Sequence, residues 1–107
     1  MVLRDLAHVR TGDKGDTSQI SIIAHDPAQY PLLARNMTPA RLRQHLGVAD
    51  HVTIILYEAP FLGALNFVLE GMLRGGVTRS LALDPHGKTL GGQLLDLEIC
   101  EPAQNGR

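Results

Sequence analysis

Apolar and polar positions alternate in several short segments of the chain, and this alternation predicts β-strands. Residues 20–24 (ISIIA) are rich in β-branched side chains, and residues 51–57 are apolar on both faces. Residues 2–9, 78–83 and 96–100 alternate less regularly and are also predicted as strands. A strand that is apolar on both faces is typical of the centre of a sheet, so we expect residues 51–57 to lie there.

Helical spacing of apolar residues is clearest in residues 61–73. This segment is apolar around much of its circumference, so the pattern predicts a helix that is deeply packed or part of an interface. A second helix is predicted to begin at Pro39, with the preceding threonine as its N-cap, and to end at Gly47. Shorter helices are expected from Pro31 and over residues 90–95.

Predicted strands and helices alternate along the chain after residue 20. This order favours an α+β sandwich, a mostly antiparallel sheet with helices packed on one face, over a helical bundle or a barrel. The 107 residues contain no internal repeat, low-complexity tract or linker, so we expect a single domain over residues 1–107. A domain of this size has few residues for cleft walls, so an active site is expected to be shallow, shared between subunits or absent.

Charge and composition narrow the function classes. Ten Lys and Arg residues balance eleven Asp and Glu residues, and the resulting net charge of -1 argues against nucleic-acid and polybasic membrane partners. No apolar run approaches the roughly 18 residues of a membrane span. The charged residues after Met1 do not fit a secretion signal, and the single cysteine, Cys100, has no internal partner for a disulfide. We therefore expect a cytoplasmic protein in which Cys100 is a buried strand residue.

Residues 10–18 (RTGDKGDTS) bring two carboxylates, one ammonium and one guanidinium together within seven residues. Their glycines and aspartates are typical of a turn, so one interpretation is a polar hairpin connection with local ion pairs. Alternatively, backbone amides together with Arg10 and Lys14 could bind an anion. A third interpretation is a cation held by Asp13 and Asp16. The segment has neither the P-loop nor the EF-hand spacing.

Two polar residues beside apolar segments are further candidates. Glu58 directly follows the apolar strand, where it could act at a sheet edge or simply mark the point at which the strand meets water. Asn66 lies in the predicted apolar helix, where its amide would bond to a loop backbone or face a ligand. The five histidines lack zinc-site spacing, so we expect no metal, and nothing in the sequence indicates a cofactor.

Several motifs occur in order along the chain: RTGDKGD (10–16), ISIIA (20–24), YE (57–58), ALNFVL (64–69), GGV (75–77) and DPHGK (84–88). Together they resemble the AtuA-like ferredoxin-fold domain, which occurs at the C-terminal end of the acyclic terpene utilisation protein AtuA and as separate small chains. The resemblance extends from about Leu3 to Pro102, and its most specific parts are the R-[ST]-G-D-K-G and A-L-N-F segments.

The resemblance implies a ferredoxin-like fold and a link to bacterial catabolism of acyclic terpenes or related acids handled as CoA thioesters. Because the large N-terminal domain has no counterpart in this sequence, we expect an accessory or binding module. It would pair with a larger AtuA-like partner or self-associate through residues 61–73. The alternative is a small enzyme that acts on an anionic or acyl-CoA metabolite.

In the enzyme hypothesis, the loop of residues 12–15 would grip the anionic ligand electrostatically. The ligand-binding candidates are Arg10, Gly12, Lys14, Gly15 and Asn66. The catalytic candidates, each as a general acid or base, are Asp13, Asp16 and Glu58.

Overall fold

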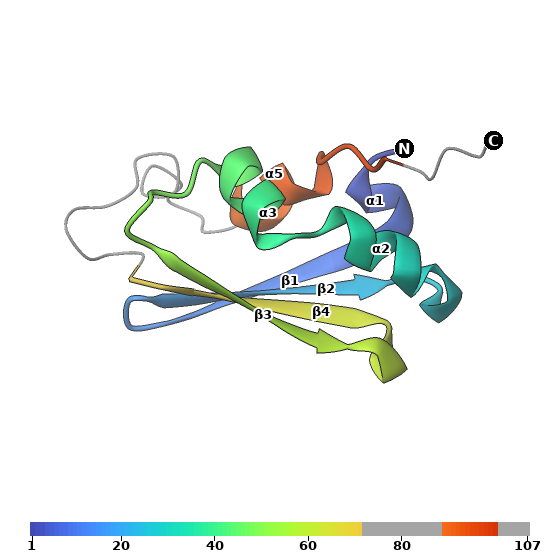
Figure 1. Ribbon diagram of the computed structural model, residues 1–107, viewed down its shortest axis with the longest axis horizontal. Helices are drawn as coiled ribbons and strands as arrows, with labels where there is room; N and C mark the ends of the chain where they lie inside the picture. The colour runs from blue at the N-terminus through green and yellow to red at the C-terminus, as the bar shows by residue number, and fades with distance from the viewer. Residues whose placement is uncertain (72–88, 101–107) are drawn as a thin grey trace.

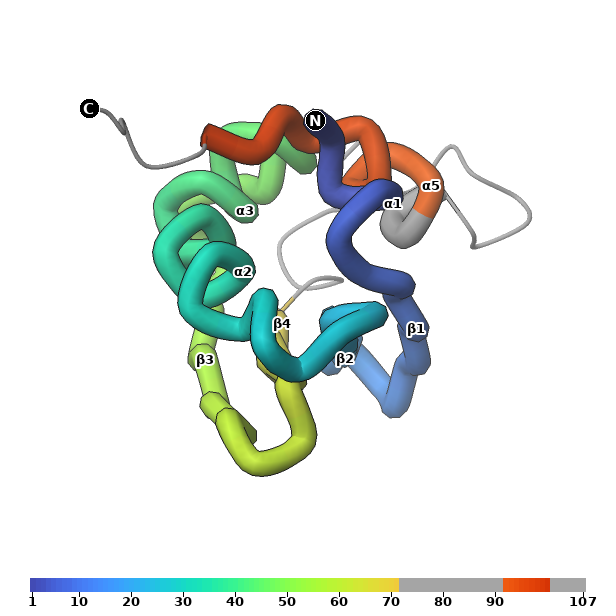
Figure 2. Tube along the Cα trace, turned by 90° about the vertical axis from the view of Figure 1, so that its right-hand side faces the viewer, coloured from blue at the N-terminus to red at the C-terminus, as the bar shows by residue number. Residues whose placement is uncertain are grey.

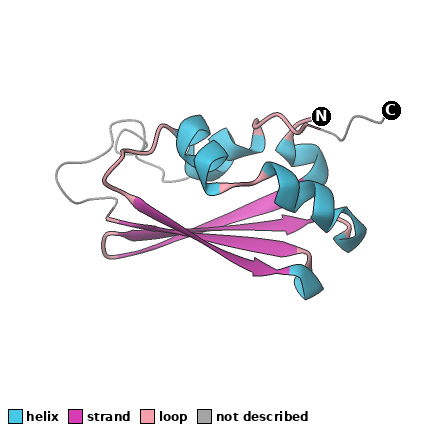
Figure 3. Cartoon of the chain, in the orientation of Figure 1, coloured by secondary structure: helices cyan, strands magenta, loops and turns pink. Residues whose placement is uncertain are grey.

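The computed structural model describes residues 1–71 and 89–100, and it shows a four-stranded antiparallel sheet with its described α-helices on one face (Figures 1 and 3). The elements in chain order are α1 (Leu3–Leu6), β1 (Ala7–Lys14), β2 (Thr17–Ala24), the 3-10 turn η1 (Pro27–Gln29), α2 (Tyr30–Asn36), α3 (Pro39–Leu46), β3 (Thr53–Ala59), the 3-10 turn η2 (Pro60–Leu62), β4 (Ala64–Glu70) and α5 (Thr89–Leu95). The predicted α+β sandwich, as expected of a ferredoxin-like domain, is confirmed.

Two hairpins form the sheet, whose strand order is β1-β2-β4-β3. In the first hairpin, Lys14 pairs with Thr17, so the turn between β1 and β2 has two residues and begins at Gly15 with a φ of +65°. In the second hairpin, η2 and Gly63 connect β3 to β4. A Cβ on Gly63 would lie 3.2 Å from Cα of Pro27, so this glycine also permits a close approach of the two 3-10 turns.

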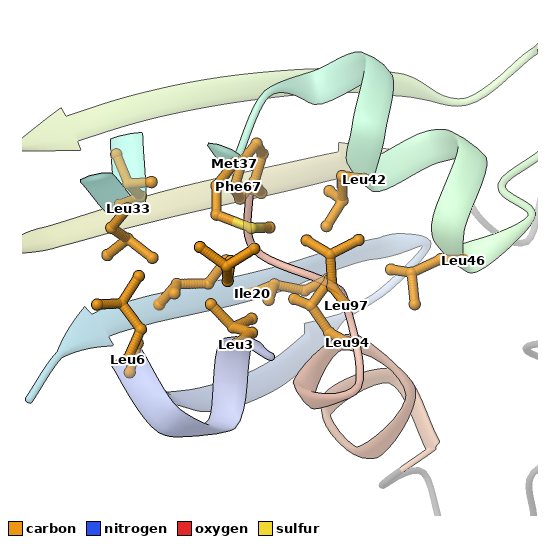
Figure 4. Packing of buried hydrophobic residues seen from close by; sticks show 14 of the residues in the cluster. Leu3, Leu6, Ile20, Leu33, Met37, Leu42, Leu46, Phe67, Leu94 and Leu97 are labelled. Carbon is orange, nitrogen blue, oxygen red and sulfur yellow. The ribbon is translucent and has the colours of Figure 1, made fainter. Parts of the chain in front are cut away.

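The hydrophobic core lies between the sheet and the helices. Figure 2, turned by 90° from Figure 1, shows these two layers of the backbone. Alternate residues of β2 and β4 point into it, among them Ile20 and Phe67, which are fully buried. Figure 4 shows leucines from α1, α2, α3 and α5 closing over these side chains. The labelled residues of the helices and of the segments that follow them are Leu3, Leu6, Leu33, Met37, Leu42, Leu46, Leu94 and Leu97.

Helix α3 follows the sequence prediction closely. Thr38 caps it, since its Oγ1 accepts a hydrogen bond of 3.2 Å from the backbone N–H of Arg41. Leu42 and Leu46, four residues apart, are both buried, and Gly47 ends the helix with a φ of +68°. The short helices expected from Pro31 and over residues 90–95 are present as α2 and α5.

The helix predicted over residues 61–73 is wrong. The described part of that segment forms η2 and then β4, whose alternate residues Leu65, Phe67 and Leu69 are buried. These apolar residues fit a period of two as well as the helical period, and β4 gains hydrogen bonds from a strand on each side. The segment of residues 51–57 was predicted at the centre of the sheet, but β3 lies at its edge because β4 takes the inner place.

The boundaries near the N-terminus also differ from the prediction. Residues 3–6 form a helix, and strand β1 begins only at Ala7. It then continues to Lys14, through most of the segment that was predicted as a loop. The backbone groups of this segment pair with β2 along its whole length, which outweighs the turn preference of its glycines and aspartates.

The strand predicted over residues 96–100 is reduced to a single bridge between Val2 and Glu98. Leu97 and Ile99 are buried as expected, but they pack beside the N-terminus. Cys100 is exposed, which corrects its prediction as a buried strand residue. The strand predicted over residues 78–83 lies outside the described residues, as do the GGV and DPHGK motifs.

Candidate functional site

The sheet has a covered face, which packs under the helices, and an open face, on which no described α-helix lies (Figure 1). Because successive strand residues point to opposite faces, some of the predicted site residues lie on the covered face and others on the open face. Arg10, Gly12, Lys14 and Asn66 share the open face, as their register shows. Four of the five ligand-binding candidates are therefore on one surface, and Gly15 begins the turn beside it.

A row of polar residues crosses the open face at right angles to the strands. Arg10 pairs with Ser21, Ser21 with Asn66, and Asn66 with Tyr57. The Ser21 hydroxyl donates a hydrogen bond of 2.9 Å to Oδ1 of Asn66. This bond fixes the Asn66 amide, and its Nδ2 has no hydrogen-bond acceptor among residues 1–71 and 89–100. The prediction that Asn66 lies in a helix is wrong, because it is a half-buried residue of β4.

A shallow hollow of about 330 Å³ lies beside this row. It is lined by Arg10, Thr11, Gly12, Gln19, Ser21 and Ile23. Gly12 leaves open space, since a Cβ built on it would meet no atom within 4 Å. The guanidinium of Arg10 is exposed and has no hydrogen-bond or ion-pair partner in the part of the chain that the structure describes. A cation, an amide and an apolar wall at one hollow suit a small anion with a hydrocarbon part.

The carboxylates named as catalytic candidates do not converge. Asp13 lies on β1 and accepts a hydrogen bond of 2.7 Å from the hydroxyl of Ser18, which is buried. Glu58 lies on β3 at the diagonally opposite corner of the sheet. Four residues along the strands and three strand spacings separate them, about 13 Å by about 14 Å. Asp16 lies in the turn at the Asp13 end. Asp13 and Glu58 therefore cannot act as a pair on one substrate atom.

Glu58 is bound to a helix residue. Its Oε1 accepts a hydrogen bond of 2.9 Å from the hydroxyl of Tyr30, which connects β3 to α2. Partial burial raises the pKa of Tyr30 above its ordinary value of 10.0, and the hydrogen bond and the charge of Glu58 raise it further. Glu58 therefore serves as a structural hydrogen-bond acceptor at the edge of the covered face.

Ser21, Gln19 and Tyr57 belong to the polar row or the hollow and were not among the sequence candidates. A signal was present, because Gln19 and Ser21 alternate with Ile20 and Ile22 and mark the open face of β2. Tyr57 was marked only by its place opposite Asn66, and that place is known only once the strand register is known.

No group of three His, Cys, Asp or Glu side chains within residues 1–71 and 89–100 is placed to hold a metal ion. In the same ranges, each helix is too short or too polar to cross a bilayer.

Comparison with known families decides the classification. The sequence-family model of the AtuA ferredoxin-like domain matches residues 1–100 of this chain. The chain belongs to the AtuA ferredoxin-like domain family. The resemblance drawn from the sequence motifs is thus confirmed. No match is found among curated proteins or among solved structures.

The fold of this AtuA ferredoxin-like domain brings its two most specific motifs together. Arg10 begins the RTGDKGD segment on β1, and Asn66 belongs to the ALNF segment on β4. Both residues are register neighbours of Ser21 on β2, so the two motifs meet at the polar row of the open face.

Proposed function

We propose that this AtuA ferredoxin-like domain is an accessory binding module that docks onto another protein chain in the cytoplasm. The observation that carries the proposal is an apolar docking patch, defined as Ile55, Tyr57, Phe61 and Leu62. Phe61 is 98% exposed, Leu62 72% and Tyr57 55%. Exposed apolar groups that gather on one surface mark interaction sites more often than scattered ones do.

The docking patch follows the second hairpin. Ile55 and Tyr57 lie on the open face of β3, and Phe61 and Leu62 belong to the turn η2 that follows this strand. Of the interface expected in residues 61–73, this proposal retains Phe61 and Leu62, which belong to a turn and not to a helix. The partner is either a larger AtuA-like chain or a second copy of this domain.

Family membership supports a role in the catabolism of acyclic terpenes or related acyl-CoA compounds. A fold family alone does not define a reaction, so this part of the proposal depends on the partner. The enzyme alternative has less support because Asp13 and Glu58 lie at opposite corners of the sheet. The open face retains the features of a ligand site.

Light scattering after size exclusion, combined with co-purification with a larger AtuA-like chain, tests the docking. We expect the wild type to form an oligomer or to retain the larger chain, and the double variant Phe61→Ser/Leu62→Ser to do neither. Both side chains are exposed, so the double variant is expected to stay folded, with about 0.5 kcal/mol or less of stability lost per site.

Ala40→Ser is the matched control, because Ala40 is exposed on α3, away from the docking patch. It should behave as the wild type in both measurements. A wild type that is monomeric and retains no larger chain would contradict the proposal.

A further inference from the structure

We propose that the hollow beside Arg10 binds the carboxylate of a small aliphatic acid. The inference does not depend on the docking patch, because the hollow is lined by residues of β1 and β2 whereas the patch lies on β3 and η2. It concerns a ligand-binding activity and assigns no reaction to the domain.

Arg10 supplies the charge for this site. Its guanidinium is exposed on the open face and finds no acceptor among the described residues. A guanidinium presents parallel N–H groups that match the two oxygens of a carboxylate. A carboxylate that lies over Ser21 is flanked by Arg10 on one neighbouring strand and by Asn66 on the other.

Asn66 supplies hydrogen-bond donors on the far side of Ser21. Since Oδ1 of Asn66 already accepts the bond of 2.9 Å from Ser21, its amide orientation is set and Nδ2 is left as a donor without an acceptor among the described residues. Gln19, which lines the hollow, adds a second amide within the same surface. The row thus offers donors in excess of acceptors, as an anion requires.

The hollow also accommodates a short hydrocarbon chain. Gly12 leaves its floor without a side chain, and Ile23 provides an apolar wall. The volume of about 330 Å³ is near the lower end of the range for small-molecule sites, so the ligand is small.

The charge of the site favours a monoanion. Arg10 is the charged residue of the lining, whereas Lys14 lies four residues further along β1, about 13 Å away. A carboxylate carries one negative charge, whereas a phosphate monoester carries up to two, so a single guanidinium neutralises the carboxylate completely. Carboxylates are therefore the ligand class that the hollow fits.

Titration of the isotope-labelled full chain with hexanoate, followed by amide NMR shifts, tests the inference. We expect saturable shifts at the amides of Thr11, Gly12 and Ser21. Neutral hexanamide, which has the same hydrocarbon chain, should bind at least about tenfold more weakly because it lacks the charge-assisted bond to Arg10. Hexyl phosphate should bind no more tightly than hexanoate.

Two variants, each with its own control, test whether the binding takes place in the hollow. Arg10→Gln should weaken hexanoate binding by about tenfold or more, whereas Arg35→Gln, at an exposed arginine of α2, should leave it unchanged. Gly12→Leu should abolish binding by filling the hollow. Gly12→Ala, a smaller change at the same position, should reduce binding only partly, and the open space at Gly12 lets both variants fold.

The inference is overturned if hexanoate produces no saturable shifts, if hexanamide binds equally well, or if Arg10→Gln binds like the wild type. Tighter binding of hexyl phosphate would overturn the assignment to carboxylates. Phe61→Ser/Leu62→Ser should retain hexanoate binding, so failure of the docking proposal and failure of this one give different results.

Discussion

The two faces of β2 and β4 are made from alternate residues of the same strands, yet they differ in burial and in polarity. On the covered face, Ile20 and Phe67 are fully buried under the helices. On the open face, their chain neighbours Ser21 and Asn66 are half-buried and bonded to each other. The covered face therefore supplies stability, while the open face leaves polar groups available for binding.

The open face is itself divided between the two hairpins. Its first hairpin carries the cations Arg10 and Lys14, whereas its second carries Ile55 and Tyr57 and leads into the exposed Phe61. The first surface suits a small anion and the second a protein partner, and the two meet where Asn66 pairs with Tyr57.

Phe67→Ala tests the covered face and carries the largest expected effect. It should lower the free energy of unfolding by about 3–5 kcal/mol, because it leaves a cavity under the helices. This is a large part of the roughly 5–15 kcal/mol of a typical domain. Its matched control is Val68→Ala, at the next residue on the open face, with an expected loss of about 1 kcal/mol.

Urea unfolding followed by circular dichroism measures both variants. Similar losses for Phe67→Ala and Val68→Ala would break the distinction between the two faces.

Asn36→Ala tests a buried asparagine against the half-buried Asn66. Nδ2 of Asn36 donates to the carbonyls of Leu32 and Cys100, and its Oδ1 accepts from Arg41 and from the Cys100 N–H. Removing the amide leaves buried partners unsatisfied, so we expect a loss of about 2–3 kcal/mol.

Asn66→Ala removes one half-buried hydrogen bond, to Ser21, and should cost about 1 kcal/mol. The urea concentrations at which the two variants are half unfolded measure the two losses of stability. A larger loss for Asn66→Ala than for Asn36→Ala would show that the open face contributes more to stability than the helix layer does.

The contact of Tyr30 with Glu58, at the edge of the covered face, has the smallest expected effect. Because the folded-state pKa of Tyr30 is raised above 10.0, the contact stabilises the fold below pH 10 and is lost as the pH rises through the folded pKa. In Tyr57→Phe, Tyr30 is the sole tyrosine and its ionisation can be followed by ultraviolet absorbance.

Adding Glu58→Gln to the Tyr57→Phe background should lower the midpoint of this titration, since the carboxylate charge is removed. An unchanged midpoint would mean that Glu58 does not contribute to the raised pKa of Tyr30.

Local signals in the sequence were sufficient for several elements. The limits of α3 were predictable because Thr38, Pro39 and Gly47 act through the backbone beside them. The strand of residues 20–24 was predictable because its β-branched residues prefer extended backbone. The ALNFVL segment was predicted wrongly because its apolar residues satisfy both periods, and only pairing with β2 and β3 selects the strand.

By itself, the sequence determined the α+β class, the family and the polar segment in which Arg10 lies, because local periodicity, capping and motif order carry that information. Only the tertiary structure decided that Asn66 faces the same surface as Arg10 and that Glu58 does not. The physical reason is register. Which residues become neighbours across β1, β2 and β4 depends on hydrogen bonds and burial between segments far apart in the chain.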